Sequence, residues 1–405
     1  MFGPFDIDKF IEQHVTGRQH SLLEADLAAH ELLLHERAAG QSVLVIGGAG
    51  SIGAAFIKAL LPYRPARLYV VDTNENALTE LTRDLRSTPG LFIPDDYKPY
   101  AMSFGDQVFK KLLHREGPFD IIAHFAAHKH VRSEKDHYAV EAMIENNVLR
   151  THRLLKLLAD QPPKRFFSVS TDKAANPVNV MGASKKLMEE LLMSFSDAYP
   201  ICTARFANVA FSNGSLLDGF LHRLVKRQPL TAPSDIRRFF VSPREAGELC
   251  LLACLLGHPG DIYFPKLAEA HMKTFQEIAA ALLHYMGYTP LECASEDEAR
   301  EAAAQLKAKD KNYPVFFFNS DTSGEKPYEE FYTDQEVIDW QRFEGLGVIS
   351  GHTSHSRYDI EKFLRRLENL FREEKLSKSS IVQLLADFIP SFHHIETGKG
   401  LDQKM

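Results

Sequence analysis

The sequence is poor in cysteine, with four in 405 residues: Cys202, Cys250, Cys254 and Cys293. So few and so scattered cysteines exclude a disulfide framework and favour a reducing compartment. An excess of basic residues is also missing, because 47 Lys and Arg against 54 Asp and Glu give a formal net charge of −7. This balance argues against a nucleic-acid-binding protein, which needs a basic face.

Long apolar runs are missing as well. The best candidate, residues 249–256, falls far short of the roughly 18 residues that a membrane span requires. The N-terminus carries charges at Asp6, Asp8 and Lys9 and has no long apolar core, which argues against a signal peptide. We therefore expect a cytoplasmic protein without membrane insertion.

What is present is an alternation of strand-like and helix-like segments. Strands are predicted over 42–46, 67–71, 119–124 and 165–170, and helices over 75–87, 139–158 and 183–196. Such alternation is typical of right-handed βαβ units, so the predicted fold is α/β, a Rossmann-type doubly wound parallel sheet. The predicted division is a helical extension over 1–40, a nucleotide-binding domain over 41–210 with a return around 236–264, a smaller substrate-binding lobe over 211–345, and a helical extension over 346–405.

A glycine-rich loop follows the first predicted strand and opens a helix. Gly47, Gly50 and Gly53 have the spacing G-x-x-G-x-x-G, which lets a backbone turn tightly and approach a pyrophosphate at a helix N-terminus. Asp72 closes the second strand, 25 residues after Gly47, where it would accept from a ribose hydroxyl and repel a 2′-phosphate. The loop therefore predicts a dinucleotide site that takes NAD rather than NADP, with Ser51 and Ile52 also in contact.

Several further segments together carry a family resemblance: GGAGSIG (47–53), VVDTNENAL (70–78), AAHKHV (126–131), ENNV (145–148), SVSTDKAANPVNVMGASK (168–185), RFANV (205–209), DIRRFF (235–240) and SGEKPYEE (323–330). In this order, over roughly residues 42–330, the chain resembles the extended short-chain dehydrogenase/reductase superfamily. Within it, the chain resembles the nucleotide-sugar 4,6-dehydratases that act on UDP-N-acetylglucosamine.

The chain departs from that superfamily at its usual Tyr-x-x-x-Lys motif. Met181 stands at the tyrosine position, whereas Lys185 is kept, and a thioether cannot act as a general acid or base. Two interpretations follow: a catalytically silent NAD-binding protein, or an enzyme in which another residue carries the proton. The dehydratase branch includes members with methionine here, which resemble enzymes that retain the C5 configuration.

The neighbouring triplet favours the active interpretation. By resemblance, Asp172 is the acid for the C6 oxygen, Lys173 the base at C5, and Thr171 orients the C4 hydroxyl. Lys185 would hold the nicotinamide ribose and help the proton leave. An adjacent carboxylate and amine can be tuned towards neutral pH, but the sequence does not identify the group that accepts the C4 proton.

The resemblance also implies binding residues. Further cofactor contacts are expected at Asn74, Asp106, Ala126, Ala127 and Asn147, and substrate contacts at Lys129, Asn208, Ser215, Arg238 and Glu325. Arg238 is the expected diphosphate clamp, with Arg237 a rival, because a guanidinium can pair bidentately with phosphate. No metal is expected, since the histidines at 128, 130, 393 and 394 lack a ligand cluster.

The predicted function is thus an NAD-dependent UDP-N-acetylglucosamine 4,6-dehydratase that serves surface polysaccharide or protein glycosylation. A nucleotide-sugar 4-epimerase is the nearest alternative enzyme, but epimerases depend on the tyrosine that this chain lacks. The silent NAD-binding protein is the other alternative. Relatives often dimerise through the helices expected over 139–158 and 183–196, so a homodimer or higher homo-oligomer is also predicted.

Overall fold

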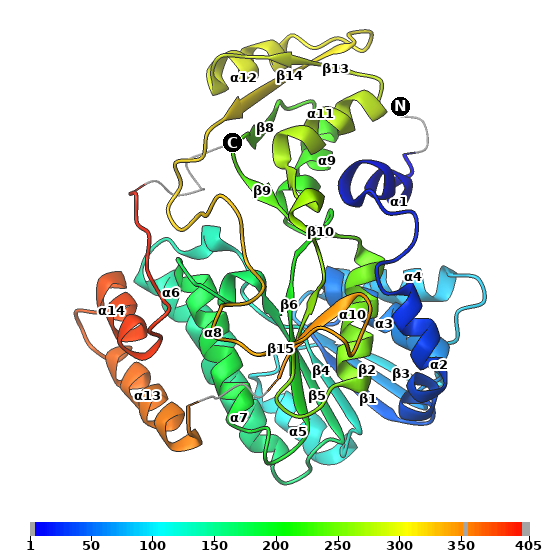
Figure 1. Cartoon of the computed structure of the whole chain (residues 1–405), viewed down its shortest axis with the longest axis vertical. Coiled ribbons are helices and arrows are strands. Elements are labelled where there is room, and N and C mark those ends of the chain that lie inside the picture. The colour runs from blue at the N-terminus through cyan, green and yellow to red at the C-terminus, as the bar shows by residue number, and fades with distance from the viewer. Residues whose placement is uncertain (1–4, 351–354, 399–405) are drawn as a thin grey trace.

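The computed structural model describes residues 5–350 and 355–398, and within them the main element is a nine-stranded sheet (Figure 1). Its spatial order is β3 (Asp96–Ala101), β2 (Arg67–Asp72), β1 (Ser42–Ile46), β4 (Ile121–His124), β5 (Arg165–Thr171), β6 (Ile201–Phe206), β11 (Ile262–Pro265), β16 (Leu346–Ile349) and β15 (Ile338–Asp339). The strands from β3 to β11 are parallel, and β16 is antiparallel to both its neighbours. This arrangement confirms the predicted Rossmann-type fold.

Helices cover both faces of this sheet. One face carries α2 (Glu24–Ala38), α3 (Ser51–Leu60) and α10 (Pro243–Leu256); the other carries α5 (Gln107–Glu116), α7 (Arg150–Leu158) and α8 (Val180–Met193) (Figure 1). Further helices are α4 (Glu75–Ser87), beside β2 and β3, and α6 (His137–Ile144). The strand β1, buried between two helical layers, is apolar over 43–46. Among the described residues, none of the helices combines the length and the apolar character that a membrane crossing would need.

The C-terminal helices form an additional layer outside α8. They are α13 (Arg357–Leu370) and α14 (Lys378–Phe388), which contact α8 and α6. Lys156 of α7 pairs with Glu361 at 3.1 Å, and the rings of Phe363 and Phe388 stack at 4.0 Å. The helix faces expected at a dimer interface are therefore covered by the same chain, and homo-oligomerisation stays a prediction.

A smaller lobe stands at the carboxyl edge of the main sheet (Figure 1). Its strands β13 (Thr289–Glu292), β14 (Asn312–Phe318) and β8 (Leu230–Pro233) are parallel, and its helices are α9 (Leu216–Lys226), α11 (Phe275–Tyr285) and α12 (Glu296–Ala304). It has a separate apolar core, to which α9, α11 and the strands contribute. A pocket between this lobe and the sheet is thus bounded by two independently packed units.

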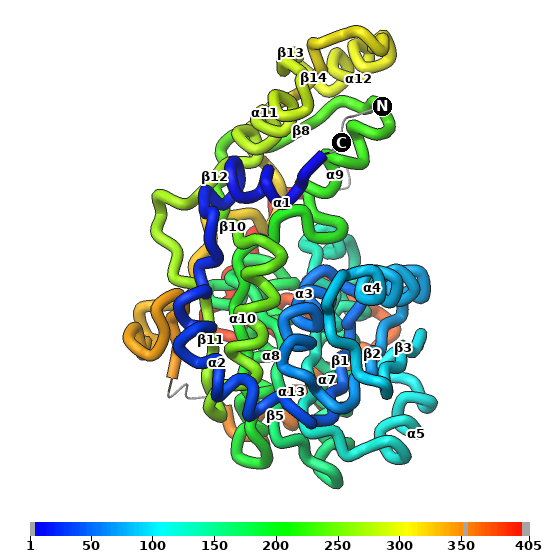
Figure 2. Tube along the Cα trace, turned by 90° about the vertical axis from the view of Figure 1, so that its right-hand side faces the viewer, coloured from blue at the N-terminus to red at the C-terminus, as the bar shows by residue number. Residues whose placement is uncertain are grey.

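The N-terminal segment connects both units (Figure 2). The helix α1 (Ile7–Phe10) and a π-helical turn (Ile11–Thr16) bury Phe10 and Val15 in the core of the lobe. Arg18 then forms an ion pair with Glu245 of α10 at 2.7 Å, and α2 continues beside α10. This segment therefore does not extend away from the fold but ties the lobe to the main domain.

Short strand pairs link the two units: β7 (Asn208–Val209) with β10 (Phe240–Val241), and β9 (Arg237–Arg238) with β12 (Lys273–Thr274). The chain also returns to the main sheet as β15 and β16, at the point where we expected the lobe to end and a helical extension to begin. Strands of two and four residues are too short to show a clear sequence period. Residues 1–4, 351–354 and 399–405 of the expected extensions lie outside the described residues.

Candidate active site

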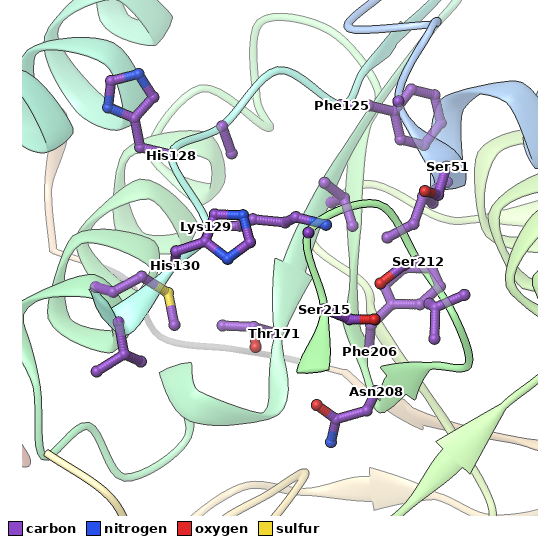
Figure 3. A pocket seen from close by; sticks show the side chains of 18 of the residues that line it. Ser51, Phe125, His128, Lys129, His130, Thr171, Phe206, Asn208, Ser212 and Ser215 are labelled. Atoms are coloured by element: carbon purple, nitrogen blue, oxygen red, sulfur yellow. The ribbon is translucent and has the colours of Figure 1, made fainter. Parts of the chain in front are cut away.

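A cavity of about 1100 Å³ lies between the carboxyl edge of the main sheet and the lobe. Strand order reverses beside β1, since β2 and β3 lie on one side and β4 to β6 on the other. Open α/β sheets bind ligands at such a reversal. Figure 3 shows side chains from the glycine-rich helix, from residues 125–130 and from β5 facing the same cavity.

The glycine-rich loop forms one end of the cavity. Gly47 has φ +77°, and a Cβ on it would lie 2.4 Å from the backbone nitrogen of Ala126; a Cβ on Gly53 would lie 2.5 Å from the Gly47 oxygen. Gly50 differs, because a Cβ there would meet only the Gly47 oxygen at 3.5 Å and would otherwise enter the cavity. Gly50 is the N-cap residue of α3, and no side chain caps this end of the helix. The loop therefore provides an open cradle at a helix N-terminus, as a pyrophosphate requires.

Asp72 lines the cavity and holds this loop. One carboxylate oxygen accepts from the Ala49 amide at 3.1 Å and the other from the Asn74 amide at 2.9 Å. The side chains of Asn74 and Asp106 do not line the cavity: Asn74 caps α4, and Asp106 accepts from the Ser103 amide at 2.9 Å. These two expected contacts thus stabilise turns beside the cavity in this structure.

Ala126 and Ala127 line the cavity, whereas Asn147 lies behind them. The Asn147 amide accepts from the His128 backbone at 2.8 Å and donates to the Ser184 hydroxyl at 3.1 Å. It belongs to a π-helical turn (Glu145–Leu149), a distortion common at functional sites. Asn147 therefore joins the cavity wall to α8 rather than facing a ligand.

The predicted catalytic triplet stands at the end of β5 and lines the cavity. One oxygen of Asp172, Oδ1, accepts from the Thr171 hydroxyl at 2.8 Å and from the backbone nitrogen and Nζ of Lys173, each at 2.9 Å. Glu329 lies 3.7 Å from the Lys173 ammonium. Burial alone would lower the pKa of Lys173, but the carboxylates of Asp172 and Glu329 outweigh it and raise that pKa above its usual value.

Glu329 was not predicted as a site residue. Its side chain is buried, and burial raises its carboxyl pKa against the opposing effect of Lys173. The only sequence signal was its place in the segment 323–330 that carries the resemblance, beside a second glutamate. Its distance from Lys173 depends on a loop that returns 156 residues later in the chain, which local patterns do not show.

Met181 and Lys185 lie one turn apart on α8, and both line the cavity. The Lys185 ammonium donates to the Val169 carbonyl at 2.7 Å. Burial lowers the pKa of Lys185 to about 8, despite the opposing charge of Glu189. The two residues of the predicted motif thus share the cavity wall, a thioether at the first position and an amine with a lowered pKa at the second.

The predicted substrate contacts Lys129, Asn208, Ser215 and Glu325 all line the cavity, and Figure 3 labels the first three of them. The Lys129 ammonium donates to the Asn213 carbonyl at 3.0 Å. Glu325 accepts from the Thr322 hydroxyl at 2.7 Å. These side chains come from both units, so the cavity can enclose a ligand that spans the sheet and the lobe.

Arg238, the expected diphosphate clamp, does not line the cavity. Its guanidinium is buried, donates to the carbonyls of Lys326 and Pro327 at 3.0 and 3.2 Å, and lies 3.6 Å from Glu325. Arg237 is exposed. The guanidinium that does line the cavity on the lobe side is Arg223 of α9, which the sequence did not single out because it lies outside the family motifs.

Outside the cavity, Glu134, His394 and Glu396 are close enough for a common metal ion. However, the Lys378 ammonium pairs with Glu134 at 3.2 Å and with Glu396 at 2.5 Å. A divalent cation would have to displace this ammonium. The four side chains instead join the C-terminal segment to the loop that follows the cavity residues 126–130.

Comparison with known proteins supports a common ancestry. Residues 43–350 match the family model described as polysaccharide biosynthesis protein. An uncharacterized membrane protein of Methanocaldococcus jannaschii is 33% identical over 76% of this chain and 85% of its own length. A capsular polysaccharide biosynthesis protein of Staphylococcus aureus is 25% identical over 92% of the chain but only 57% of its own length. A UDP-glucose 4-epimerase of Rickettsia bellii is 29% identical over 84% of the chain and 99% of its own length.

Among solved structures, a dTDP-glucose 4,6-dehydratase from Streptomyces venezuelae matches with a TM-score of 0.56 at 20% identity. The match covers 82% of this chain and 97% of that one. At this identity the likeness concerns the fold, and it agrees with the sheet and lobe described above.

Proposed function

The chain belongs to the polysaccharide biosynthesis protein family of extended short-chain dehydrogenases/reductases, and from this membership we propose that it is a UDP-N-acetylglucosamine 4,6-dehydratase. The product would be a UDP-2-acetamido-2,6-dideoxy-4-keto-hexose with the C5 configuration retained. The observation that carries this proposal is the Asp172–Lys173 pair, which faces the same cavity as the glycine-rich loop while Met181 replaces the phenol. Cytoplasmic location and homo-oligomerisation stay predictions.

The cofactor we propose is NAD, and the residues fit it. The open cradle at Gly50 suits the pyrophosphate, and the Asp72 carboxylate at the end of β2 suits the adenosine ribose. Ala126 and Lys185 would lie on the nicotinamide side. When bound, NAD supplies the oxidant for C4 and the reductant for C6 of the sugar.

Side chains of the protein carry out the acid–base steps of the reaction. Thr171 orients the C4 hydroxyl, Asp172 protonates the departing C6 oxygen, and Lys173 removes the C5 proton that the 4-ketone makes acidic. A lysine can remove a proton only as a neutral amine. Glu329, at 3.7 Å from Nζ and with a carboxyl pKa raised chiefly by burial, is placed to take the extra proton from Lys173.

The substrate would extend from this end of the cavity into the lobe. We propose that Lys129 and Arg223 face its diphosphate and that Glu325 accepts from the uridine ribose, because all three side chains line the cavity. Arg238 would act indirectly, since it lies beside the Glu325 carboxylate at 3.6 Å. Asn208 and Ser215 remain proposed substrate contacts.

The reaction type can be tested directly. Incubation of the protein with UDP-N-acetylglucosamine and NAD should yield a product lighter by one water, with no lasting rise in NADH absorbance, because the electrons return to the sugar. An isomer of unchanged mass would instead establish an epimerase, the activity named for the Rickettsia relative, and no reaction would support a silent NAD-binding protein. Stoichiometric accumulation of NADH would contradict the dehydratase, and NMR of the product would report the C5 configuration.

The cofactor site predicts different outcomes for two neighbouring glycines. Gly50→Ala should weaken NAD binding about tenfold or more, about 1.4 kcal/mol, without loss of stability, because its Cβ enters the cradle and meets no atom closer than 3.5 Å. Gly48→Ala should instead destabilise the fold, since its Cβ would lie 2.5 Å from a Val70 methyl group. Calorimetric titration with NAD and thermal melting separate the two effects. Unchanged NAD affinity in Gly50→Ala would place the cofactor elsewhere.

A further inference from the structure

The C-terminal segment that follows α14 returns to the rim of the cavity. In Figure 1 this segment runs from α14 along the main domain towards the lobe. Residues 393–397 of it are called the strap below. The His393 amide donates to the Pro177 carbonyl at 3.1 Å. The Ile395 amide donates to the Val178 carbonyl at 2.9 Å. The strap is therefore attached to the short segment that leads into α8, a helix of the cavity wall.

Further hydrogen bonds join the strap to residues 321–324, which directly precede Glu325. They run from the Gly324 amide to the Ile395 carbonyl at 2.9 Å, from the Ser323 hydroxyl to the Glu396 carboxylate at 2.7 Å, from the Thr397 amide to the Ser323 hydroxyl at 2.9 Å, and from the Thr397 hydroxyl to the Asp321 carbonyl at 2.9 Å. Thr322 and Glu325 line the cavity, whereas the strap residues do not. The strap thus holds a wall segment without being part of the wall.

Charged side chains fix the strap to the main domain. His394 Nε2 lies 2.5 Å from Glu134 Oε1. The Lys378 ammonium, at the start of α14, pairs with Glu134 at 3.2 Å and with Glu396 at 2.5 Å. The other carboxylate oxygen of Glu134 accepts from the amide of Val180, the first residue of α8, at 2.6 Å. These contacts tie the strap to the same helix end as its backbone does, so the strap is a fixed support for residues 321–324.

Gly324 is held between the strap and α8. Its amide donates to the strap, and its carbonyl accepts from the Asn179 side chain at 2.7 Å. Its φ is +69°, and a Cβ on it would lie 2.7 Å from the Asn179 Cβ. Asn179 also caps α8 by accepting from the Gly182 amide at 2.7 Å. The turn that directs the next residue, Glu325, therefore depends on the helix cap on one side and on the strap on the other.

The Glu325 carboxylate takes its orientation from its own segment. The hydroxyls of Ser320 and Thr322 both donate to its Oε2. Its Oε1 lies 3.6 Å from the Arg238 guanidinium and can still accept from a ligand. Because the donors to Oε2 belong to the segment that carries Glu325, they move with it. The position of the carboxylate in the cavity is then set by the attachments of the whole segment, and the strap provides most of these.

We propose that the strap is a positioning element for substrate binding, which holds residues 321–324 so that Glu325 meets the ribose of the bound nucleotide. This inference rests on the proposed function, which places the uridine ribose at Glu325. The strap acts through Glu325 and touches no ligand itself. A wall segment that is ordered before the ligand arrives lowers the entropic cost of binding. Release of the strap should therefore weaken nucleotide binding and leave the NAD end of the cavity, at Gly50 and Asp72, unchanged.

Two variants at one position separate the backbone contacts of the strap from its side chains. Ile395→Pro removes the amide that donates to Val178. Ile395→Ala keeps this amide and shortens a side chain that is 40% exposed. In calorimetric titrations of the full chain, Ile395→Pro should bind UDP about tenfold more weakly, the effect of one or two lost hydrogen bonds. Its NAD affinity should be unchanged, and Ile395→Ala should bind both ligands as the wild type does.

A second site of release avoids dependence on a proline. Thr397→Val removes the hydroxyl that donates to the Asp321 carbonyl at 2.9 Å, and it should weaken UDP binding about threefold. Thr397→Ser keeps the hydroxyl and should restore the wild-type affinity. Thermal melting of each variant checks that the chain is folded under the conditions of the titration.

A nucleotide without ribose hydroxyls shows whether the strap acts through Glu325. The probe is 2′,3′-dideoxyuridine diphosphate, which cannot donate to a carboxylate at the ribose. Wild-type protein should bind it about tenfold more weakly than UDP, as expected for a lost hydrogen bond to a charged group. In Ile395→Pro this preference for UDP should largely disappear. A strap that only stabilised the fold would lower the affinity for both nucleotides equally and leave the preference intact.

The outcomes distinguish this inference from the proposed function. If wild-type protein neither binds UDP nor dehydrates UDP-N-acetylglucosamine, the proposed function fails. If wild-type protein does both and prefers UDP to the dideoxy analogue, an unchanged preference in Ile395→Pro and Thr397→Val overturns the inference. Equal binding of UDP and the analogue by the wild type would also overturn it, since Glu325 would then not meet the ribose. A parallel loss of UDP and NAD affinity in the strap variants would leave the strap a purely structural role, again against the inference.

Discussion

Replacement of Lys173 by alanine is expected to abolish exchange of the C5 hydrogen with solvent deuterium and to slow dehydration about 10²–10⁴-fold. Lys173 is the amine at the carboxyl end of β5 that contacts Asp172 at 2.9 Å and Glu329 at 3.7 Å. Without it, the 4-keto intermediate would form but keep its C5 hydrogen. The measurement is NMR of UDP-N-acetylglucosamine incubated with enzyme and NAD in deuterated water.

Two controls make this prediction specific. Lys164→Ala removes an exposed lysine just before β5, whose ammonium pairs with Asp120 at 2.9 Å, and should leave exchange and dehydration unchanged. Oxidation at C4 of UDP-N-acetyl-6-deoxyglucosamine, an analogue that lacks the C6 hydroxyl and so cannot lose water, should survive in Lys173→Ala, because the C4 step does not use this amine. Exchange at an undiminished rate in Lys173→Ala would remove Lys173 from the role of base.

Replacement of Arg205 by methionine is expected to cost about 3–5 kcal/mol of folding stability. Arg205 of β6 is fully buried and forms paired hydrogen bonds with Glu189 at 3.0 and 2.9 Å and with Glu336 at 2.9 and 2.8 Å. Methionine fills similar volume but removes the guanidinium from the Glu189 and Glu336 carboxylates, and the Lys186 ammonium lies farther from Glu189, at 3.8 Å. Chemical denaturation measures the loss, and an undiminished stability would show that these carboxylates find other partners.

Further variants, and the pH dependence of stability, test whether the unpaired carboxylates cause the loss of stability in Arg205→Met. The triple variant Arg205→Met, Glu189→Gln, Glu336→Gln should recover part of the stability, whereas Arg357→Met, which breaks an exposed pair, should cost no more than about 1 kcal/mol. Burial alone would raise the pKa of Glu189, but Arg205 outweighs it and lowers that pKa below the ordinary value. The contribution of Glu189 to wild-type stability is therefore fully present above the ordinary carboxyl pKa, and it is lost as the pH falls through the lowered pKa of Glu189. In Arg205→Met the loss of stability is largest at neutral pH, where Glu189 and Glu336 are ionised. As the pH falls these carboxylates are protonated, so the free energies of unfolding of the wild type and the variant converge in acid.

The sequence predicted the parts of this fold that local patterns encode. The glycine-rich loop, the alternation of strands and helices, and the triplet after β5 all depend on residues close in the chain, and the structure brings Gly50, Asp172 and Lys185 to one cavity. Glu329 and Arg205 could not be predicted in this way. Glu329 reaches Lys173 from a loop 156 residues later in the chain. Arg205 pairs not only with Glu189 of α8 but also with Glu336, 131 residues later.

Arg238 is a residue that a motif identified but whose surroundings the sequence could not predict. Its motif predicted a ligand contact, but carbonyl groups of residues 326 and 327 are within 3.0 and 3.2 Å of its guanidinium, and those residues arrive from a distant loop. Whether an arginine faces a cavity depends on which acceptors the fold places beside it. A motif specifies the residue type but not these competing acceptors.

The N-terminal segment has a consequence for how ligands enter and leave. Two lobes that close on a ligand usually move about a hinge formed by the segments that connect them. Here, Phe10 and Val15 are buried in the lobe while Arg18 is paired with Glu245 of the main domain, so the N-terminal segment is a further connection across the boundary between the two units. Wide opening of the lobes would have to pull these side chains from their sites. If the chain binds NAD as proposed, openings that leave this tether in place favour a tightly held nucleotide over one released in every turnover.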